Sequence, residues 1–426
     1  MAHVPCVFDS NWCYAVIPSQ YLRARARTLI GPQSAGPLLK RPRYPTKRSL
    51  KGFGHALVNF LEWCAATGRR WEEADYLEDI IEGYQADMST GRWSMRGNPL
   101  KPRTMNGRVD EACKFLRWAA SQGCRVPFEV PTVTTTRPSE TGTSTHAFRR
   151  STEVRVGAVR PDPITLRIPT DAEVTAWHES VRIESGPTKA LMCELVLETG
   201  IRREETVQWQ LDTLPLDPAS WHRSGTEVMV SIMYGTKGPK RPDGRGGEVG
   251  PRRDIWLPES LALQLHHYRE KVRPGLRAQF VRSADSLEEK RKRMRESKTQ
   301  LFLSDSTGEP VSAQRFYDAW TGASRRPYPG WSVHLGRHWW SCKKLLRGCS
   351  TRLKIASLGP TYGEQHGVVT STAIDIIKLI IEPQLGHVSG KTAYAYLVWI
   401  QRVLMLTSLH DDYEQELEKV VATFEV

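Results

Sequence analysis

Apolar residues in the first third of the chain recur with the period of an amphipathic helix, so residues 46–128 are predicted to form a small helical domain. Two sets of positions carry this pattern: Phe53, Leu57, Phe60, Leu61 and Cys64, then Met105, Val109, Ala112, Leu116 and Ala119. Gly68 and Gly123 lie just beyond the two sets, where glycine often ends a helix. Residues 1–45 show no comparable period and are predicted to be an N-terminal extension, either an arm or a cap.

The helical pattern stops near residue 128. Residues 131–145 are mostly threonine, serine, proline and charged side chains, which offer little to bury. Residues 129–163 are therefore predicted to be a linker between two domains.

A second domain is predicted over residues 164–408, and it begins with helices. Thr170 and Glu173 have the spacing of a capping box, which starts a helix. A later apolar helix ends at Gly200. The segment 409–426 is predicted to be an amphipathic, acidic C-terminal helix.

Strand patterns occur within this second domain. Residues 228–234 and 253–257 indicate a β-hairpin with a long glycine-rich tip, and residues 301–303 indicate a short strand. The predicted fold is therefore mainly α with a small antiparallel β-sheet.

The charge balance indicates a class of partner. The chain has 60 Lys+Arg against 47 Asp+Glu, a net charge of +13 with pI ≈ 9.4. Such a chain favours polyanions, because each phosphate contact releases counterions. Basic stretches at 21–27 and 282–298 are either nucleic-acid contacts or solvated faces. The helical domain supplies further candidate DNA contacts: Lys101, Arg103, Arg108 and Lys114.

Other sequence features narrow the class of protein. None of the eight cysteines forms a C-x-x-C pair, which favours reduced, buried thiols over disulfides or a zinc site. The N-terminus lacks a signal-peptide pattern, and no apolar run is long enough to span a bilayer. We therefore expect a cytoplasmic protein, nucleoid-associated when bound to DNA, with no membrane partner, cofactor or metal.

Four segments carry residues suited to phosphate chemistry. In chain order they are Glu198-Thr199-Gly200-Ile201-Arg202 with Glu205 three residues on, Gly235-Thr236-Lys237-Gly238, His334-Leu335-Gly336-Arg337-His338, and Leu385-Gly386-His387 with Tyr396 nine residues later. Cutting a phosphodiester without a metal needs fixed positive charge on the phosphate, a nucleophile and an acid for the leaving group. Arginines, a tyrosine, a lysine and histidines can supply these groups.

The order and spacing of these segments resemble the tyrosine recombinase (phage integrase) family. The flanks fit as well: residues 253–258 resemble the family's second hairpin strand, and residues 301–304 its short element before the His-x-x-Arg-His helix. The resemblance covers about residues 165–410 by motif. It covers about residues 46–128 only by helical character, where the family has a core-binding domain.

The resemblance implies a role for each residue. Arg202 and Arg337 would clamp the scissile phosphate, and Lys237 would protonate the leaving 5′ oxygen. His334 and His387 would hydrogen-bond the phosphate or assist proton transfer. Tyr396 would attack, giving a 3′-phosphotyrosyl link. Two further residues would support the site: Glu205 and His338.

The implied function is that of a site-specific DNA recombinase or integrase. It would act on duplex DNA through a Holliday junction, as a homotetramer in the synapse, with or without a second recombinase or accessory protein. The two domains would form a clamp on DNA. The C-terminal helix would dock on a neighbouring protomer or on its own domain. A type IB topoisomerase-like enzyme and a catalytically silent DNA-binding protein are the alternatives.

Some assignments within the site have rivals. Tyr394 competes with Tyr396 as nucleophile, and Lys240 competes with Lys237 as acid. His334 and His338 have the i, i+4 spacing of zinc ligands, but the intervening Arg337 argues against a metal.

The chain also departs from the family pattern at two places. The segment between His338 and His387 is about twice the usual length, and an inserted loop is predicted at about residues 348–372. The hairpin tip, residues 239–251, is also long.

Overall fold

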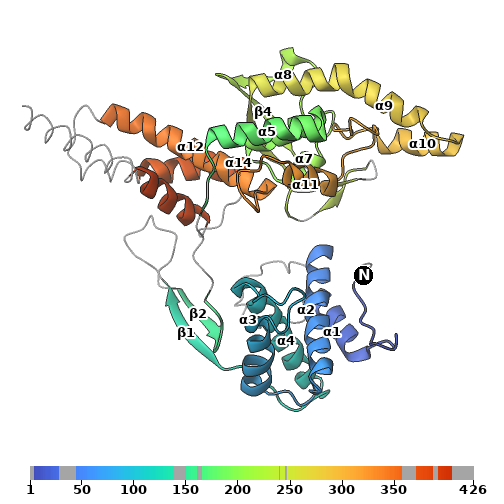
Figure 1. The fold of residues 1–426 in the computed structure, drawn as a ribbon, viewed down its shortest axis with the longest axis vertical. Coiled ribbons are helices and arrows are strands. Elements are labelled where there is room, and N and C mark those ends of the chain that lie inside the picture. The colour runs from blue at the N-terminus through green and yellow to red at the C-terminus, as the bar shows by residue number, and fades with distance from the viewer. Residues whose placement is uncertain are drawn as a thin grey trace, which may run out of the picture. The chain divides into compact units, whose positions relative to one another are not determined.

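The computed structural model describes residues 4–27, 45–137, 150–160, 166–238, 240–244, 247–356, 371–386 and 392–404. The chain divides into two compact units, Met1–Pro163 and Ile164–Val426. Each unit has its own hydrophobic core, and the helices and strands of both are drawn in Figure 1.

The first unit is helical. Its elements are α1 (Val16–Ala26), α2 (Lys47–Ala66), the π-helix η1 (Tyr76–Gln85), α3 (Ala86–Thr90), α4 (Pro102–Ser121), β1 (Thr132–Arg137) and β2 (Arg150–Arg155). The two predicted helical periods are confirmed, since they form the buried faces of α2 and α4. Leu57, Phe60, Val109 and Leu116 are fully buried in this core.

The N-terminal segment belongs to this core. α1 packs on α2 and α4 and buries Tyr21 and Leu22 completely. Arg25 donates from Nε to Glu111 Oε1 at 3.2 Å. The arginine-rich stretch is therefore a packed helix that uses at least one of its arginines within the fold.

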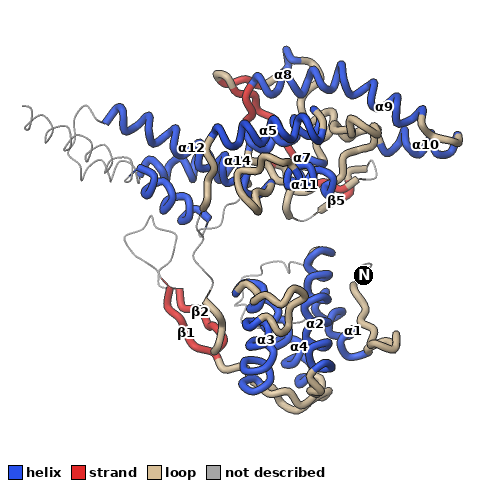
Figure 2. The backbone as a smooth tube through the Cα atoms, viewed as in Figure 1, coloured by secondary structure: helices blue, strands red, loops and turns tan. Residues whose placement is uncertain are grey.

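The segment predicted as a linker contains an antiparallel hairpin. β1 pairs with β2 from Thr132 opposite Arg155 to Arg137 opposite Arg150 (Figure 2). Polarity alone predicts no strand here, but threonine and valine are β-branched and favour extended backbone. Beyond β2, the Gln85 amide donates to the Gly157 carbonyl at 2.8 Å, which ties this stretch to the helices.

The second unit is also mainly helical. Its elements are α5 (Asp171–Ser185), α6 (Pro187–Thr199), α7 (Arg203–Val207), η2 (Pro218–Ser220), β3 (His222–Ser224), β4 (Glu227–Ile232), β5 (Arg241–Pro242), β6 (Glu248–Val249), β7 (Arg253–Pro258), α8 (Glu259–His267), η3 (Tyr268–Val272), α9 (Arg273–Arg282), α10 (Leu287–Glu296), α11 (Ala313–Gly322), α12 (Val333–Ala356), η4 (Ile377–Ile381) and α14 (Glu382–Leu385). Residues 371–376 and 392–404 are helical too. The predicted capping box is present: Glu173 N–H donates to Thr170 Oγ1 at 3.2 Å, and Thr170 N–H to Glu173 Oε2 at 2.8 Å.

The predicted hairpin is confirmed as part of a three-stranded antiparallel sheet in the order β3-β4-β7. Burial alternates along β4, so Val228, Val230 and Ile232 face the core. β5 and β6 pair at the long tip. The predicted fold class, mainly α with a small antiparallel sheet, is confirmed.

The short strand predicted at residues 301–303 is wrong. This stretch makes an isolated bridge between Leu303 and Pro310. Its backbone bonds go to two separate segments, because Leu301 N–H donates to the Trp209 carbonyl and the Phe302 carbonyl accepts from Val311. No single neighbouring strand in the described residues forms a ladder with it.

Helices also occupy the charged stretch at residues 282–298 and the start of the predicted loop at about residues 348–372. α8, η3 and α9 follow one another as a long helical run, and α10 folds back against α9 (Figure 1). The loop predicted at about residues 348–372 is wrong at its start, because α12 continues to Ala356. Gly348 lets α12 approach Ile376 so closely that a Cβ would lie 2.4 Å from its Cδ1. Residues 357–370 lie outside the described residues.

No helix within the described ranges is long and apolar enough to cross a membrane. The eight cysteines are all free thiols, and most are buried as predicted; Cys6 and Cys13 are exposed.

Candidate active site

Arg202 lies where α6 turns into α7. Gly200 ends α6 with φ 65°, and a Cβ there would lie 2.7 Å from the Trp340 ring, so this turn requires glycine. Glu205, which is 1% exposed, accepts from the Arg202 backbone N–H at 2.7 Å and from its Nη1 at 2.9 Å. The guanidinium of Arg202 is thus oriented by a buried carboxylate.

Arg253 is the second arginine that pairs with this carboxylate, and the sequence motifs did not identify it as a site residue. It begins β7, and its Nη2 donates to Glu205 Oε2 at 2.6 Å. Burial lowers the pKa of Arg253, and Glu205 opposes that shift. No local spacing signals this role, because the register between β4 and β7 brings Arg253 to the site.

Arg337, on α12, joins the cluster through backbone carbonyls. It donates from Nη1 to the Gly200 carbonyl at 2.8 Å and from Nη2 to the Leu385 carbonyl at 2.6 Å. Arg202 Nη2 donates to the adjacent Gly386 carbonyl at 2.9 Å. The end of α14 therefore serves as a common acceptor for these guanidiniums.

Gln384 fixes the end of α14 in place. Its side-chain amide donates to the Thr199 carbonyl at 3.0 Å and to the Trp256 carbonyl at 2.8 Å, and its oxygen accepts from the Trp256 N–H. One buried side chain thereby joins the end of α6, the strand β7 and α14.

The arginine cluster has more positive than negative charge. Arg202 and Arg253 pair with the one carboxylate of Glu205, whose charge also acts on Arg337. Burial and the neighbouring Arg202 lower the pKa of Arg337 to about 9. Each guanidinium has five N–H donors, more than its described bonds to carbonyls and carboxylate require. Such a cluster is suited to bind an anion with several oxygens.

Tyr396 lies beside the two histidines of α12. Its hydroxyl is 2.8 Å from His338 Nδ1, and His338 Nε2 is 3.2 Å from His334 Nε2. Tyr396 is 1% exposed, and burial raises its pKa to about 12. Burial, His334 and Arg337 lower the pKa of His338 to about 4. Burial, Arg337 and Arg202 also lower the pKa of His334.

Tyr394, the rival nucleophile, faces elsewhere. Its side chain is 64% exposed, whereas Tyr396 contacts His338. Residues two apart on a helix do not share a face, so only one of the two can reach the cluster.

The loop that carries Lys237 packs against α7. Gly235 has φ 70°, and a Cβ there would lie 2.3 Å from the Glu204 carbonyl oxygen. The loop is thus held against the residues that follow Arg202, and Lys237, two residues beyond Gly235, is exposed. Lys240 Nζ donates to the Thr236 carbonyl at 2.7 Å and so holds the loop.

The remaining predicted site residues are not part of the described cluster. His387 is not among the described residues. Arg103 and Lys114 are exposed on α4, and Lys101 is exposed at its N-cap, while Arg108 is half-buried with Nη1 4.0 Å from Met88 Sδ. They belong to the first unit.

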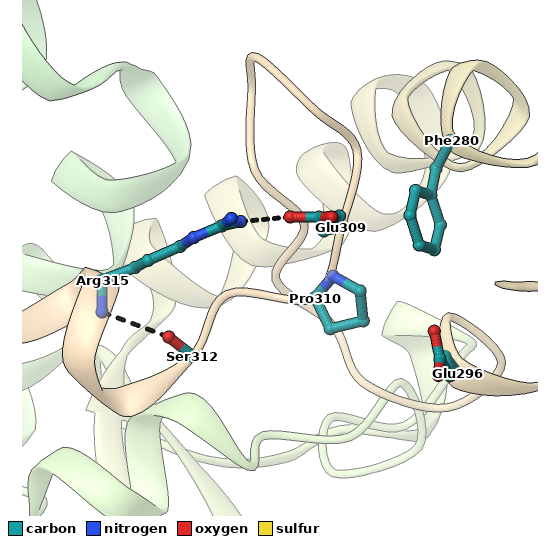
Figure 3. A pocket seen from close by; sticks show the side chains of 6 residues that line it. All are labelled: Phe280, Glu296, Glu309, Pro310, Ser312 and Arg315. Carbon is teal, nitrogen blue, oxygen red and sulfur yellow. Dashed lines mark hydrogen bonds and ion pairs between the residues drawn. The ribbon is translucent and has the colours of Figure 1, made fainter. Parts of the chain in front are cut away.

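A hollow elsewhere in the second unit is not part of this site. It has a volume of about 530 Å³ and is lined by Phe280, Glu296, Glu309, Pro310, Ser312 and Arg315 (Figure 3). Arg315 is paired with Glu309 across it, and Glu296 adds a second carboxylate. A hollow with two carboxylates and one paired arginine does not suit a phosphate.

Among the described residues, no group of three or more His, Cys, Asp or Glu side chains could hold a metal ion. The pair of His334 and His338 is instead engaged with Tyr396.

No protein-family model and no curated protein matches the chain. Solved structures do. XerH site-specific recombinase bound to difH substrate is 14% identical, with 89% of this chain and 91% of that chain covered and a TM-score of 0.44. A lambda integrase dimer bound to a core site is 12% identical, with 89% and 94% covered and a TM-score of 0.44. The Tn1549 transposon integrase in complex with transposon right end DNA is 12% identical, with 89% of this chain and 99% of that chain covered and a TM-score of 0.41.

The chain is similar to tyrosine recombinases. The identities of these three structures to this chain are 12–14%, and their TM-scores are below 0.5.

Proposed function

We propose that this protein is a site-specific tyrosine recombinase or integrase. The observation that carries the proposal is the site itself: Arg202 and Arg337 donate to the adjacent Gly386 and Leu385 carbonyls, and Tyr396 is bonded to His338, the residue after Arg337. These residues come from segments far apart in the sequence and match the positions of the family motif.

The arginines would hold the scissile phosphate. Arg202 and Arg337 are fixed by Glu205 and by carbonyls of the Leu385–Gly386 backbone, so they need little reorganisation on binding. Their excess positive charge would stabilise the additional negative charge of the pentacovalent state. His334 and His387 would donate further hydrogen bonds to this phosphate.

Tyr396 would attack the phosphorus. The bond from phosphorus to the 5′ oxygen breaks as the phosphotyrosyl bond forms, and Lys237 supplies the proton for the leaving oxygen. Attack by the 5′ hydroxyl of a partner strand reverses these steps and completes exchange. Because the covalent link conserves the bond energy, no nucleotide cofactor is required.

The two units would hold duplex DNA between them, and four protomers would form the synapse. The exposed basic residues of α4 support a DNA-binding role for the first unit. This arrangement, and any accessory protein, belongs to the proposal.

A trapping experiment tests the function. Duplexes that the protein binds are selected from a pool with a random core, and nicked versions are made with the nick moved one base at a time. Cleavage near the nick releases a short fragment, so the protein–DNA adduct accumulates. We expect a denaturation-resistant adduct with wild type and with Tyr394→Phe, and none with Tyr396→Phe.

The other outcomes separate the alternatives. Loss of the adduct only in Tyr394→Phe would keep the chemistry and move the nucleophile by two residues. No adduct on tightly bound duplexes would indicate a silent DNA-binding protein. Relaxation of supercoiled plasmid irrespective of sequence would indicate a topoisomerase-like enzyme.

A further inference from the structure

The nucleophile proposed above starts from an unfavourable protonation state. Tyr396 is buried, and burial raises its pKa to about 12, with Arg337 and the Ser341 hydroxyl only partly opposing the shift. Near neutral pH its phenol therefore keeps its proton almost completely. Attack on phosphorus requires a base within hydrogen-bond reach of the hydroxyl.

His338 is the side chain in that position. Its Nδ1 lies 2.8 Å from the Tyr396 hydroxyl. The groups that face it are Tyr396, His334 and Arg337, and burial next to these groups lowers the pKa of His338 to about 4. His338 is therefore neutral near neutral pH, so it has a lone pair with which to accept a proton.

His334 continues the line from His338 toward solvent. Its Nε2 lies 3.2 Å from His338 Nε2, and part of the residue is accessible to solvent. Burial lowers the pKa of His334 most, and Arg337 and Arg202 add to that shift, so a phosphate bound at these arginines would offset their charge and remove their part of it. Substrate binding would thus make His334 a better proton acceptor.

We propose that His338 and His334 form a two-step proton relay that deprotonates Tyr396. The Tyr396 O–H proton moves to His338 Nδ1 as the oxygen bonds to phosphorus, and the proton on His338 Nε2 moves to His334 Nε2. His334 becomes an imidazolium beside the phosphate and adds a charged donor. Strand rejoining runs the relay backwards and returns the proton to Tyr396.

The relay makes His338 a catalytic residue, beyond the supporting role that the sequence motif assigns to it. The proposed relay rests on the proposed cleavage activity. Adduct formation and its dependence on His338 are therefore measured with the same nicked duplexes under single-turnover conditions. If wild type forms no adduct, the proposed function fails. If wild type forms the adduct and the variants below behave like it, only the relay fails.

The informative variant is His338→Asn. Asparagine can place an acceptor oxygen near the Nδ1 position but cannot carry a proton onward. We expect DNA binding to be unchanged and cleavage at pH 7 to fall by about 10²–10⁴-fold, the usual contribution of a general base. The deficit should shrink as the pH rises, because hydroxide then replaces the base. The matched control is His178→Asn, a half-buried histidine bonded to the Ala190 carbonyl, which should cleave like wild type.

A second measurement separates proton transfer from packing. Replacing Tyr396 with 3,5-difluorotyrosine lowers the phenol pKa, and we expect it to recover much of the rate lost in His338→Asn. His334→Asn should also slow cleavage, and the double variant should be no slower than the slower single variant, because both break one relay. A His338→Asn deficit that neither difluorotyrosine nor high pH reduces would overturn the relay and leave His338 a packing residue.

Discussion

At the scale of single residues, one buried carboxylate holds the arginine cluster together. Glu205 accepts from Arg202 and Arg253, and it is 1% exposed. Its negative charge is the one that offsets the positive charge of these guanidiniums within the described cluster. The carboxylate therefore determines both the stability of the unit and the orientation of Arg202.

Replacing this carboxylate should destabilise the protein. We expect Glu205→Gln to lower the free energy of unfolding by about 3–5 kcal/mol, the range for leaving a buried ion pair without one partner. The matched control is Glu204→Gln, whose half-buried side chain pairs with Arg203 and should cost about 1 kcal/mol or less. Urea unfolding of both variants measures the difference. Equal losses would contradict the role given to Glu205.

A second residue-scale prediction concerns pH. Because burial raises the pKa of Tyr396 and lowers that of His338, wild-type cleavage should lose rate as the pH falls toward about 4, where His338 becomes protonated. Single-turnover rates measured from pH 8 down to about one unit below that pKa check this. A rate that rises on acidification would contradict His338 acting as the base.

At the scale of elements, the hairpin loop before β5 sets where Lys237 lies. Gly235 allows the loop to touch the backbone of Glu204, and Lys240 holds the loop from within. The position of the proposed acid therefore depends on a backbone contact between two elements.

Adding a methyl group at that contact should displace the acid. We expect Gly235→Ala to slow cleavage by about 10²-fold, the effect of a misplacement of about 1 Å. Gly244→Ala is the matched control, because Gly244 has a similar φ of 75° but no atom within 4 Å of the new Cβ. Single-turnover cleavage compares the two. Equal rates in both variants would mean that the contact does not position Lys237.

The elements also show what the sequence could and could not predict. α2 and α4 were predictable because each buries one continuous face, and β4 because its burial alternates. α1 was not, since its apolar residues are interrupted by arginines although Tyr21 and Leu22 are fully buried. The β1-β2 hairpin was missed because its threonines are polar yet favour strands.

The same contrast holds within the candidate site. The motif spacing predicted which residues to examine, because each motif is a local pattern. Arg253 carries no such pattern, and only the strand register places it beside Glu205. The contact of His338 with Tyr396 likewise depends on packing between helices 58 residues apart in sequence.

At the scale of the whole molecule, the net charge of +13 is expected to act through particular surfaces. α4 and its N-cap expose Lys101, Arg103 and Lys114, whereas α10 exposes a comparable set, Lys290, Arg291 and Lys292, within a mixed-charge helix. If DNA lies against this part of the first unit, the first set should contribute more to counterion release than the set on α10.

Salt dependence distinguishes the two surfaces. Replacing Lys101, Arg103 and Lys114 with glutamine should reduce the slope of log affinity against log salt by up to about 3, because each phosphate contact contributes about 0.9. The same three-charge change at Lys290, Arg291 and Lys292 is the control and should reduce it by less. A larger loss in the control would place the DNA contact on α10.

The most direct test of the central claim is to identify the residue that carries the DNA. The trapped adduct is digested with nuclease and trypsin, and the peptide of residues 392–402, which contains both Tyr394 and Tyr396, is sequenced by fragmentation mass spectrometry. We predict a nucleotide attached to Tyr396 through its 3′ phosphate. A nucleotide on Tyr394 or on another peptide would contradict the proposed active site, and the absence of any nucleotide-bearing peptide would contradict the proposed chemistry.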